Sequence, residues 1–195
     1  MAVEVAGSWE SAMTGGPAEE LVEPKDPGFE NLYLAHYARV VTVLSRLTLN
    51  RAEAEELANE VFWKLYRQPL LPSPDGNVVG WLYRAATNLG IDALRKAARR
   101  RGYEHEAGRA ALESRSAASP LDDVLRDERR RRVRQVLGQL KPVQAQALVL
   151  RSSGFSYREV AAALGVKRVS VGILLLRAEE AFRKCYRKLY GEEEI

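Results

Sequence analysis

The chain has 195 residues, of which 46% are hydrophobic, and its 30 basic and 26 acidic side chains give a formal charge of +4. This length and composition allow one domain or two small ones around a buried core. The single cysteine, Cys185, excludes an internal disulfide and a cysteine-rich zinc site, and His36 and His105 stand far apart, so we expect neither metal nor cofactor. No apolar run is long enough to insert into a membrane and no signal peptide begins the chain, so we expect a cytoplasmic protein.

The charge is unevenly distributed along the chain. Residues 1–26 hold six acids and one lysine among glycines and prolines, which predicts a disordered acidic tail that could shield a basic face. The remaining residues carry a net charge of +9, which suggests a polyanionic partner. Their apolar positions repeat mainly at intervals of three and four. We therefore expect an all-α protein, with two small helical domains joined by a flexible linker.

Residues 27–101 predict a first domain of three helices. The first helix should run from about Phe29 to Leu49, and Asn50 should cap the second, with Glu53 in the capping-box position. One side of the second helix is an unbroken apolar stripe, and the other carries Trp63 among charges. A tryptophan in such a place is typical of an interface anchor. The alternative is that Trp63 folds under a neighbouring loop.

The third predicted helix, from Val79 to Arg101, ends with five basic residues within eight positions. Cations near a helix C-terminus are favourable in any case, but five exceed what capping requires. Trp81 and Tyr83, expected to be exposed, stand earlier on the same helix. Basic side chains beside exposed aromatics are the composition that holds phosphates and stacks bases, so this helix is a candidate nucleic-acid site.

Residues 102–123 predict a linker, because glycine, serine and proline break the periodicity there. A second domain should cover 124–190, followed by a short acidic tail at 191–195. Within it, residues 154–171 predict a helix-turn-helix: Ser156 and Glu159 form a capping box, and Gly165 suits the turn. The basic pair Lys167 and Arg168 favours DNA binding over an ordinary helical hairpin.

Taken together, two blocks of the sequence resemble the extracytoplasmic-function group of sigma-70 family sigma factors. Arg51 to Tyr66 resembles the polymerase-binding helix of that family, and Gly80 to Arg95, with its Trp81-Leu-Tyr-Arg run, resembles the promoter-melting helix. The block from about 124 to 190 resembles the domain that recognises the −35 element. The resemblance implies a protein that catalyses nothing. It would bind core RNA polymerase and promoter DNA, with an anti-sigma factor or another transcription factor as a further partner.

The resemblance also implies two sets of contact residues. On the second helix, the residues expected to contact the clamp of the polymerase are Glu53, Glu56, Asn59, Glu60, Trp63 and Lys64. The residues expected to contact DNA are Trp81, Arg84, Asn88, Arg95, Lys96, Arg99, Arg100 and Arg101 on the third helix, and Lys167, Arg168, Ser170 and Arg177 in the helix-turn-helix.

The second helix of that motif departs from the family pattern, because Ser170-Val171 is followed by Gly-Ile-Leu-Leu-Leu instead of polar and basic residues. We take Ile173, Leu174 and Leu176 to be more than the core needs. Three alternatives stay open: the helix contacts thymine methyl groups, it binds another protein, or the domain binds DNA weakly.

Two rival functions share these features. One is a DNA-binding transcriptional regulator without polymerase, which would not need the Trp63 helix. The other is a sigma-like interaction protein whose C-terminal helix binds a protein partner. An enzyme is the least favoured class, because no nucleophile, acid–base pair or metal cluster is assembled in the sequence.

Overall fold

The computed structural model describes residues 27–48, 50–67, 77–107 and 121–191, and backbone only at 27, 101–107 and 121–125. The predicted acidic tail at 1–26 and the last four residues lie outside this part of the chain. So do residues 108–120, which make up most of the predicted linker. The side chains of Arg101 and His105 are likewise outside the described set.

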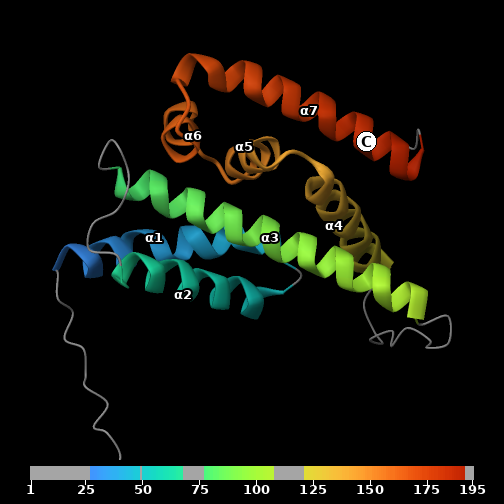
Figure 1. Ribbon diagram of the computed structural model, residues 1–195, viewed down its shortest axis with the longest axis horizontal. Helices are drawn as coiled ribbons and strands as arrows, with labels where there is room; N and C mark the ends of the chain where they lie inside the picture. Colours follow the sequence, from blue (N-terminus) through green and yellow to red (C-terminus); the bar gives the residue numbers. More distant parts are fainter. Residues whose placement is uncertain (1–26, 49, 68–76, 108–120, 192–195) are drawn as a thin grey trace, which may run out of the picture.

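Seven α-helices and no strand make up the described residues, which confirms the all-α prediction there. The helices are α1 (Pro27–Ser45), α2 (Arg51–Arg67), α3 (Val78–Ala107), α4 (Leu121–Gln139), α5 (Pro142–Ser152), α6 (Tyr157–Leu164) and α7 (Arg168–Tyr190). We call α1–α3 the N-terminal unit and α4–α7 the C-terminal unit (Figure 1).

Two helix boundaries differ from those expected. The first helix ends at Ser45, four residues early, and the chain then turns tightly, with Leu47 donating to the Leu44 carbonyl at 2.8 Å. α3 continues six residues beyond Arg101, through Gly102. One glycine costs a helix only about 1 kcal/mol, and the residues after it are ordinary helix formers, so it does not end α3.

The predicted capping residues lie where the sequence placed them. The Asn50 side chain accepts a hydrogen bond from the Glu53 amide at 2.7 Å, which begins α2. Ser156 and Glu159 form a complete capping box at α6, and Gly165 ends that helix at φ 66°. Asn77 caps α3 in the same way, through the Gly80 amide at 2.8 Å. Local side-chain chemistry therefore determines where these helices begin and end.

Within the N-terminal unit, the apolar stripe of α2 is buried against α1. Phe62 is only 2% exposed and meets the rings of Phe29, Tyr33 and Tyr37. α3 crosses α1 closely at Gly90, where an added Cβ would lie 2.6 Å from a methyl group of Leu47. Burial of these side chains from water is the main stabilising contribution to the unit.

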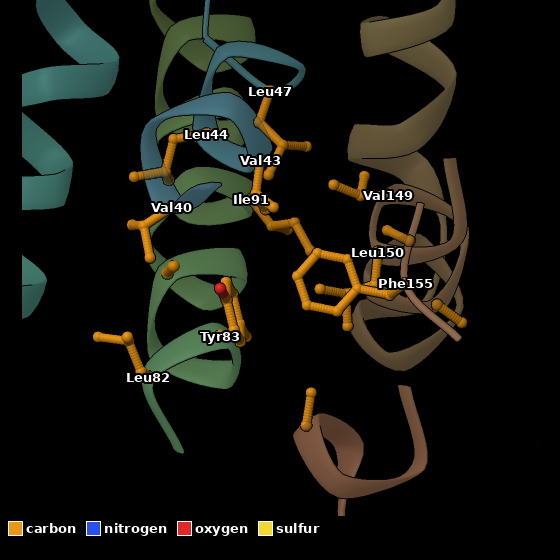
Figure 2. Packing of buried hydrophobic residues seen from close by; sticks show 14 of the residues in the cluster. Val40, Val43, Leu44, Leu47, Leu82, Tyr83, Ile91, Val149, Leu150 and Phe155 are labelled. Carbon is orange, nitrogen blue, oxygen red and sulfur yellow. The ribbon is translucent and has the colours of Figure 1, made fainter. Parts of the chain in front are cut away.

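The two units pack against each other along α3, which contacts α4, α5 and α6 as well as α1 and α2. One buried apolar cluster runs through both units (Figure 2). In it, Tyr83 and Ile91 of α3 face Val149, Leu150 and Phe155 from α5 and the loop after it. Both predicted helical units are therefore present, and their shared core holds them side by side.

Candidate functional site

The charged face of α2 is open to solvent. Glu56, Asn59, Glu60 and Lys64 are exposed, Glu53 is half-buried, and Trp63 is 57% exposed. Trp63 stacks on Tyr66, with ring centroids 5.8 Å apart, and the Arg67 guanidinium lies 5.9 Å from the indole. Lys64 pairs with Glu60 at 2.6 Å.

Among the residues that the structure describes, Trp63 has ring contacts only within its own helix, and the loop that could cover it, residues 68–76, lies outside this part of the chain. A large, pre-positioned and half-solvated aromatic among charges is the type of residue that dominates protein–protein interfaces.

The two aromatics expected to be exposed on α3 are less accessible than the sequence suggested. Tyr83 is only 2% exposed, so the expectation that it is free to stack bases was wrong. Its hydroxyl lies 2.9 Å from Nδ1 of His36, and its ring meets Phe155 edge-on at 4.5 Å. Trp81 is half-buried and packs against the shared core. Tyr83 is buried because the C-terminal unit covers a side of α3 that three helices alone would leave open.

Three of the predicted DNA-contact residues on α3 bind the C-terminal unit. Arg84 Nε donates to the Ala163 carbonyl at 2.7 Å, and Asn88 Oδ1 accepts from Gln146 at 2.6 Å. Arg95 donates through Nε and Nη2 to the carbonyls that end α4, those of Gly138 and Leu140, at 3.1 and 2.9 Å. The polar ends of these side chains therefore lie in the contact between the units.

Two glycines permit this close contact. An added Cβ at Gly80 of α3 would lie 2.6 Å from the Ala162 carbonyl oxygen of α6, and one at Gly165 would collide with the Arg84 guanidinium. Gly165 also needs its positive φ to end α6, so another residue there would be strained, and the tip of the Arg84 side chain would have to move.

The basic end of α3 stays accessible. Lys96, Arg99 and Arg100 are exposed, and none of them forms an ion pair with another described residue. Exposed arginine and lysine side chains are the residues that bind phosphates.

A second group of contacts between the units was not predicted from the sequence. Arg39 of α1 pairs with Glu159 of α6 at 2.8 Å, and its guanidinium lies 3.8 Å above the ring of Phe155, which is fully buried. The Ser156 backbone amide, and after it Arg39, lowers the pKa of Glu159 to about 2. Burial, and then the Arg39 charge, lowers the pKa of His36.

One sequence signal could have found Phe155. An apolar residue directly before an N-cap commonly packs against the helix that follows, and Phe155 precedes the capping residue Ser156.

In the helix-turn-helix, Lys167, Arg168, Ser170 and Arg177 are exposed, and Val171 is buried as the anchor of α7. Ser170 and the three cations are therefore accessible to a partner.

The apolar set on the outer face of α7 differs from the predicted one. Ile173 and Leu176 are 57% and 65% exposed, as expected, but Leu174 is half-buried against the core and is not surplus. Val169, 83% exposed, takes its place. These residues are spaced four and three apart, so Val169, Ile173 and Leu176 form one stripe, which we call the α7 stripe.

Among the described residues, no group of histidine, cysteine and acidic side chains could hold a metal ion. No helix in this part of the chain combines the length and the apolar character needed to span a membrane.

Comparisons with known proteins agree with this geometry. Residues 32–100 match the model of sigma-70 region 2, and residues 130–182 match the model of sigma-70 region 4. The chain is 33% identical to the RNA polymerase sigma factor CarQ of Myxococcus xanthus, over 86% of this chain and 91% of that protein. It is 30% identical to the RNA polymerase sigma-H factor of Pseudomonas aeruginosa, over 89% and 96% of the two chains.

A third relative, the ECF RNA polymerase sigma factor SigE of Mycolicibacterium smegmatis, is 31% identical over 85% of this chain and 64% of its own. Among solved structures, the fold resembles that of CnrH in complex with the cytosolic domain of CnrY. The TM-score is 0.51 at 18% identity, over 85% of this chain and 89% of that one.

Proposed function

This chain belongs to the extracytoplasmic-function group of the sigma-70 family, whose members bind core RNA polymerase and direct it to promoters, and we propose that α2 makes the polymerase contact. The observation that carries this proposal is the exposed Trp63 on a charged face, opposite an apolar stripe that is buried except at the half-buried Leu57. A helix that served only the core would have no reason to present an indole to solvent. The contact residues are Glu53, Glu56, Asn59, Glu60, Trp63 and Lys64.

Promoter DNA would meet α3 and the helix-turn-helix. The exposed end of α3 supplies phosphate contacts through Lys96, Arg99 and Arg100, to which the sequence adds Arg101. Trp81, Arg84, Asn88 and Arg95 would lie against the melted strand. In the helix-turn-helix, Lys167, Arg168, Ser170 and Arg177 would approach the −35 element through the major groove.

Contacts from Arg84, Asn88 and Arg95 to DNA compete with their hydrogen bonds to the C-terminal unit. We therefore infer that the two units separate along α3 when the protein engages a promoter. The free energy of polymerase and DNA binding would offset the hydrogen bonds that are broken.

The role is to position polymerase and not to carry out chemistry, so we infer that the protein is not an enzyme. Its place of action is the cytoplasm, because that is where bacterial polymerase and the chromosome are.

The test is binding of the purified chain to core polymerase, followed by abortive transcription from a fork-junction promoter library. Changing Trp63 and Glu60 together to alanine should weaken polymerase binding by about thirtyfold or more, since a buried aromatic anchor is worth about 2 kcal/mol or more at an interface. The helical circular dichroism should not change.

The matched control is Leu34→Ala, which removes another exposed apolar side chain, 72% accessible, from α1. This variant should bind as the parent does. Undiminished affinity of the Trp63 variant would refute the role of α2.

A further inference from the structure

A large cavity lies between α1 and three helices of the C-terminal unit. Its volume is about 850 Å³, within the range of ligand sites. Among the described residues, its charged lining consists of Arg46, Arg129, Arg130, Arg134 and Arg183, together with the acid Glu179. Its apolar lining is Val133, Leu137, Leu148, Val149 and Phe182. We call this site the five-arginine pocket; none of its lining residues belongs to the α2 face or to the α7 stripe.

Among the described residues, two arginines of the pocket are paired with acids and two others are not. Arg183 pairs with Glu179 at 3.6 Å, and Arg130 pairs with Asp127 at 3.4 Å. Arg46 and Arg129 are exposed, and neither enters an ion pair with another residue that the structure describes. Cations around an apolar floor favour an occupant that carries both carboxylates and apolar side chains.

The chain itself contains such a segment. Residues 1–26 carry six acids against one lysine, and Val3, Val5, Trp9 and Met13 are interspersed among them. We propose that this acidic N-terminal segment binds in the five-arginine pocket, with its carboxylates on the arginines and Trp9 over the apolar floor.

The segment is long enough to reach the pocket. It joins α1 at Pro27, and the first pocket residue on α1 is Thr42, about 22 Å further along the helix. An extended chain covers this distance in about seven residues. Residues 1–19 then remain to enter, with Glu4, Glu10 and Glu19 among them.

A smaller pocket on α1 adjoins the five-arginine pocket, and the acidic segment could follow it. Its volume is about 270 Å³, it is lined by Tyr37, Ala38, Val41 and Arg51, and it shares Thr42 and Ser45 with the larger pocket.

Because the acidic segment belongs to the same chain as the pocket, it can occupy a site for which its intrinsic affinity is weak. Surface ion pairs contribute little individually. A short tether, however, gives the segment an effective concentration of about millimolar at the pocket. The pocket walls come from both units, so an occupied pocket holds them together and opposes their separation.

The direct test is paramagnetic broadening in the full-length chain. A nitroxide is attached to Ser8→Cys in a Cys185→Ser background, and amide signals are recorded at low salt. Signals from Thr42 to Arg46, and from the pocket residues of α4 and α7, should broaden most, while those of α6 should not.

Two charge-reversal variants then distinguish binding in the pocket from a general effect of net charge. Arg46→Glu with Arg129→Glu should reduce the docked population by about tenfold, because each change replaces an attraction by a repulsion. Arg187→Glu with Lys188→Glu makes the same change in net charge outside the pocket and should leave the broadening intact. In the Arg46→Glu, Arg129→Glu variant, changing Glu4 and Glu10 to arginine should restore the broadening of the pocket signals.

Three results would overturn the proposal. The first is no broadening in the parent chain. The second is broadening centred on Lys96 and Arg100, which would place the segment on the basic end of α3. The third is broadening only in mixtures of differently labelled molecules, which would make a second copy the partner. The measurement uses no polymerase, so its outcome is independent of the function proposed above.

Discussion

The α2 and α3 helices both carry candidate contact residues, yet their surroundings differ. Trp63, Glu56 and Asn59 of α2 are exposed, whereas Arg84 and Arg95 of α3 donate hydrogen bonds to the C-terminal unit. A polymerase contact through α2, as proposed above, would need no movement of the described residues. The proposed DNA contacts of Arg84 and Arg95 would instead replace hydrogen bonds to the C-terminal unit.

The largest effect on this arrangement is expected from removing Phe155. Its ring is fully buried between α3, α5 and the Arg39 guanidinium, so Phe155→Ala should lower the free energy of unfolding by about 3 to 5 kcal/mol. Because both units share this core, one cooperative transition should shift as a whole in denaturant titrations. Two transitions, of which only one moves, would show that the units fold independently.

A milder change should separate the units without unfolding them. Gly80→Ala places a methyl group 2.6 Å from the Ala162 carbonyl oxygen and equally close to Nδ2 of the capping residue Asn77, and this overpacking should weaken the contact between the units by about 1 to 3 kcal/mol. Binding of single-stranded DNA should then tighten, because Arg84 and Asn88 are released.

The matched control for Gly80→Ala is Gly138→Ala at the same contact between the units. There the new Cβ would lie 3.7 Å from Leu94, an ordinary distance, so DNA affinity should not change. Equal effects of both variants would point to helix propensity instead of separation.

The accessible end of α3 should contribute affinity without specificity. Neutralising Lys96, Arg99 and Arg100 with glutamine should reduce the slope of log affinity against log salt by about 0.7 to 0.9 for each phosphate that the protein no longer neutralises. Titrations at several salt concentrations, on two unrelated promoter sequences, measure this slope. A change in sequence preference at constant slope would mean that these residues contact bases.

Lowering the pH should weaken the ion pair between Glu159 and Arg39. Its pKa in the folded protein is about 2, below the ordinary value of 4.5, so its contribution is present above pH 4.5 and is lost as the pH falls towards 2. The side chain is 41% exposed and therefore screened, so Glu159→Gln should cost only about 1 kcal/mol at pH 7.

Stability curves of the parent and Glu159→Gln, measured by denaturation from pH 7 to pH 2, should accordingly converge at the acid end. Glutamine keeps the capping geometry, so a constant gap at every pH would assign the destabilisation to packing instead of charge.

The smallest effect on stability is expected at the α7 stripe. Changing Val169, Ile173 and Leu176 to serine should alter the free energy of unfolding by less than about 0.5 kcal/mol for each residue, because all three are exposed. The informative measurements are therefore −35 binding and capture of a protein partner. Loss of −35 binding would mean that the stripe contacts thymine methyl groups. Loss of the protein partner alone would mean that the stripe is a protein-binding surface.

Much of the fold follows from the sequence, because its determinants are local. The apolar stripe of α2 and the caps Asn50 and Ser156 depend on residues three or four positions apart, and the structure agrees with each. The contact between the units depends on pairs such as Arg39 and Glu159, 120 positions apart. No local pattern marks such pairs. For the same reason Tyr83 was expected to be exposed: the part of the chain that covers it lies far along the sequence.

The contact of Gly165 with Arg84 has an evolutionary consequence. One glycine satisfies two requirements at once, since it ends α6 in a conformation that other residues avoid and leaves room for a guanidinium from the other unit. Asparagine sometimes replaces glycine where only the left-handed conformation matters. Natural selection would tolerate that replacement in relatives whose units never pack together. Among homologues, the choice between glycine and asparagine at this position should therefore record whether the packed form is maintained.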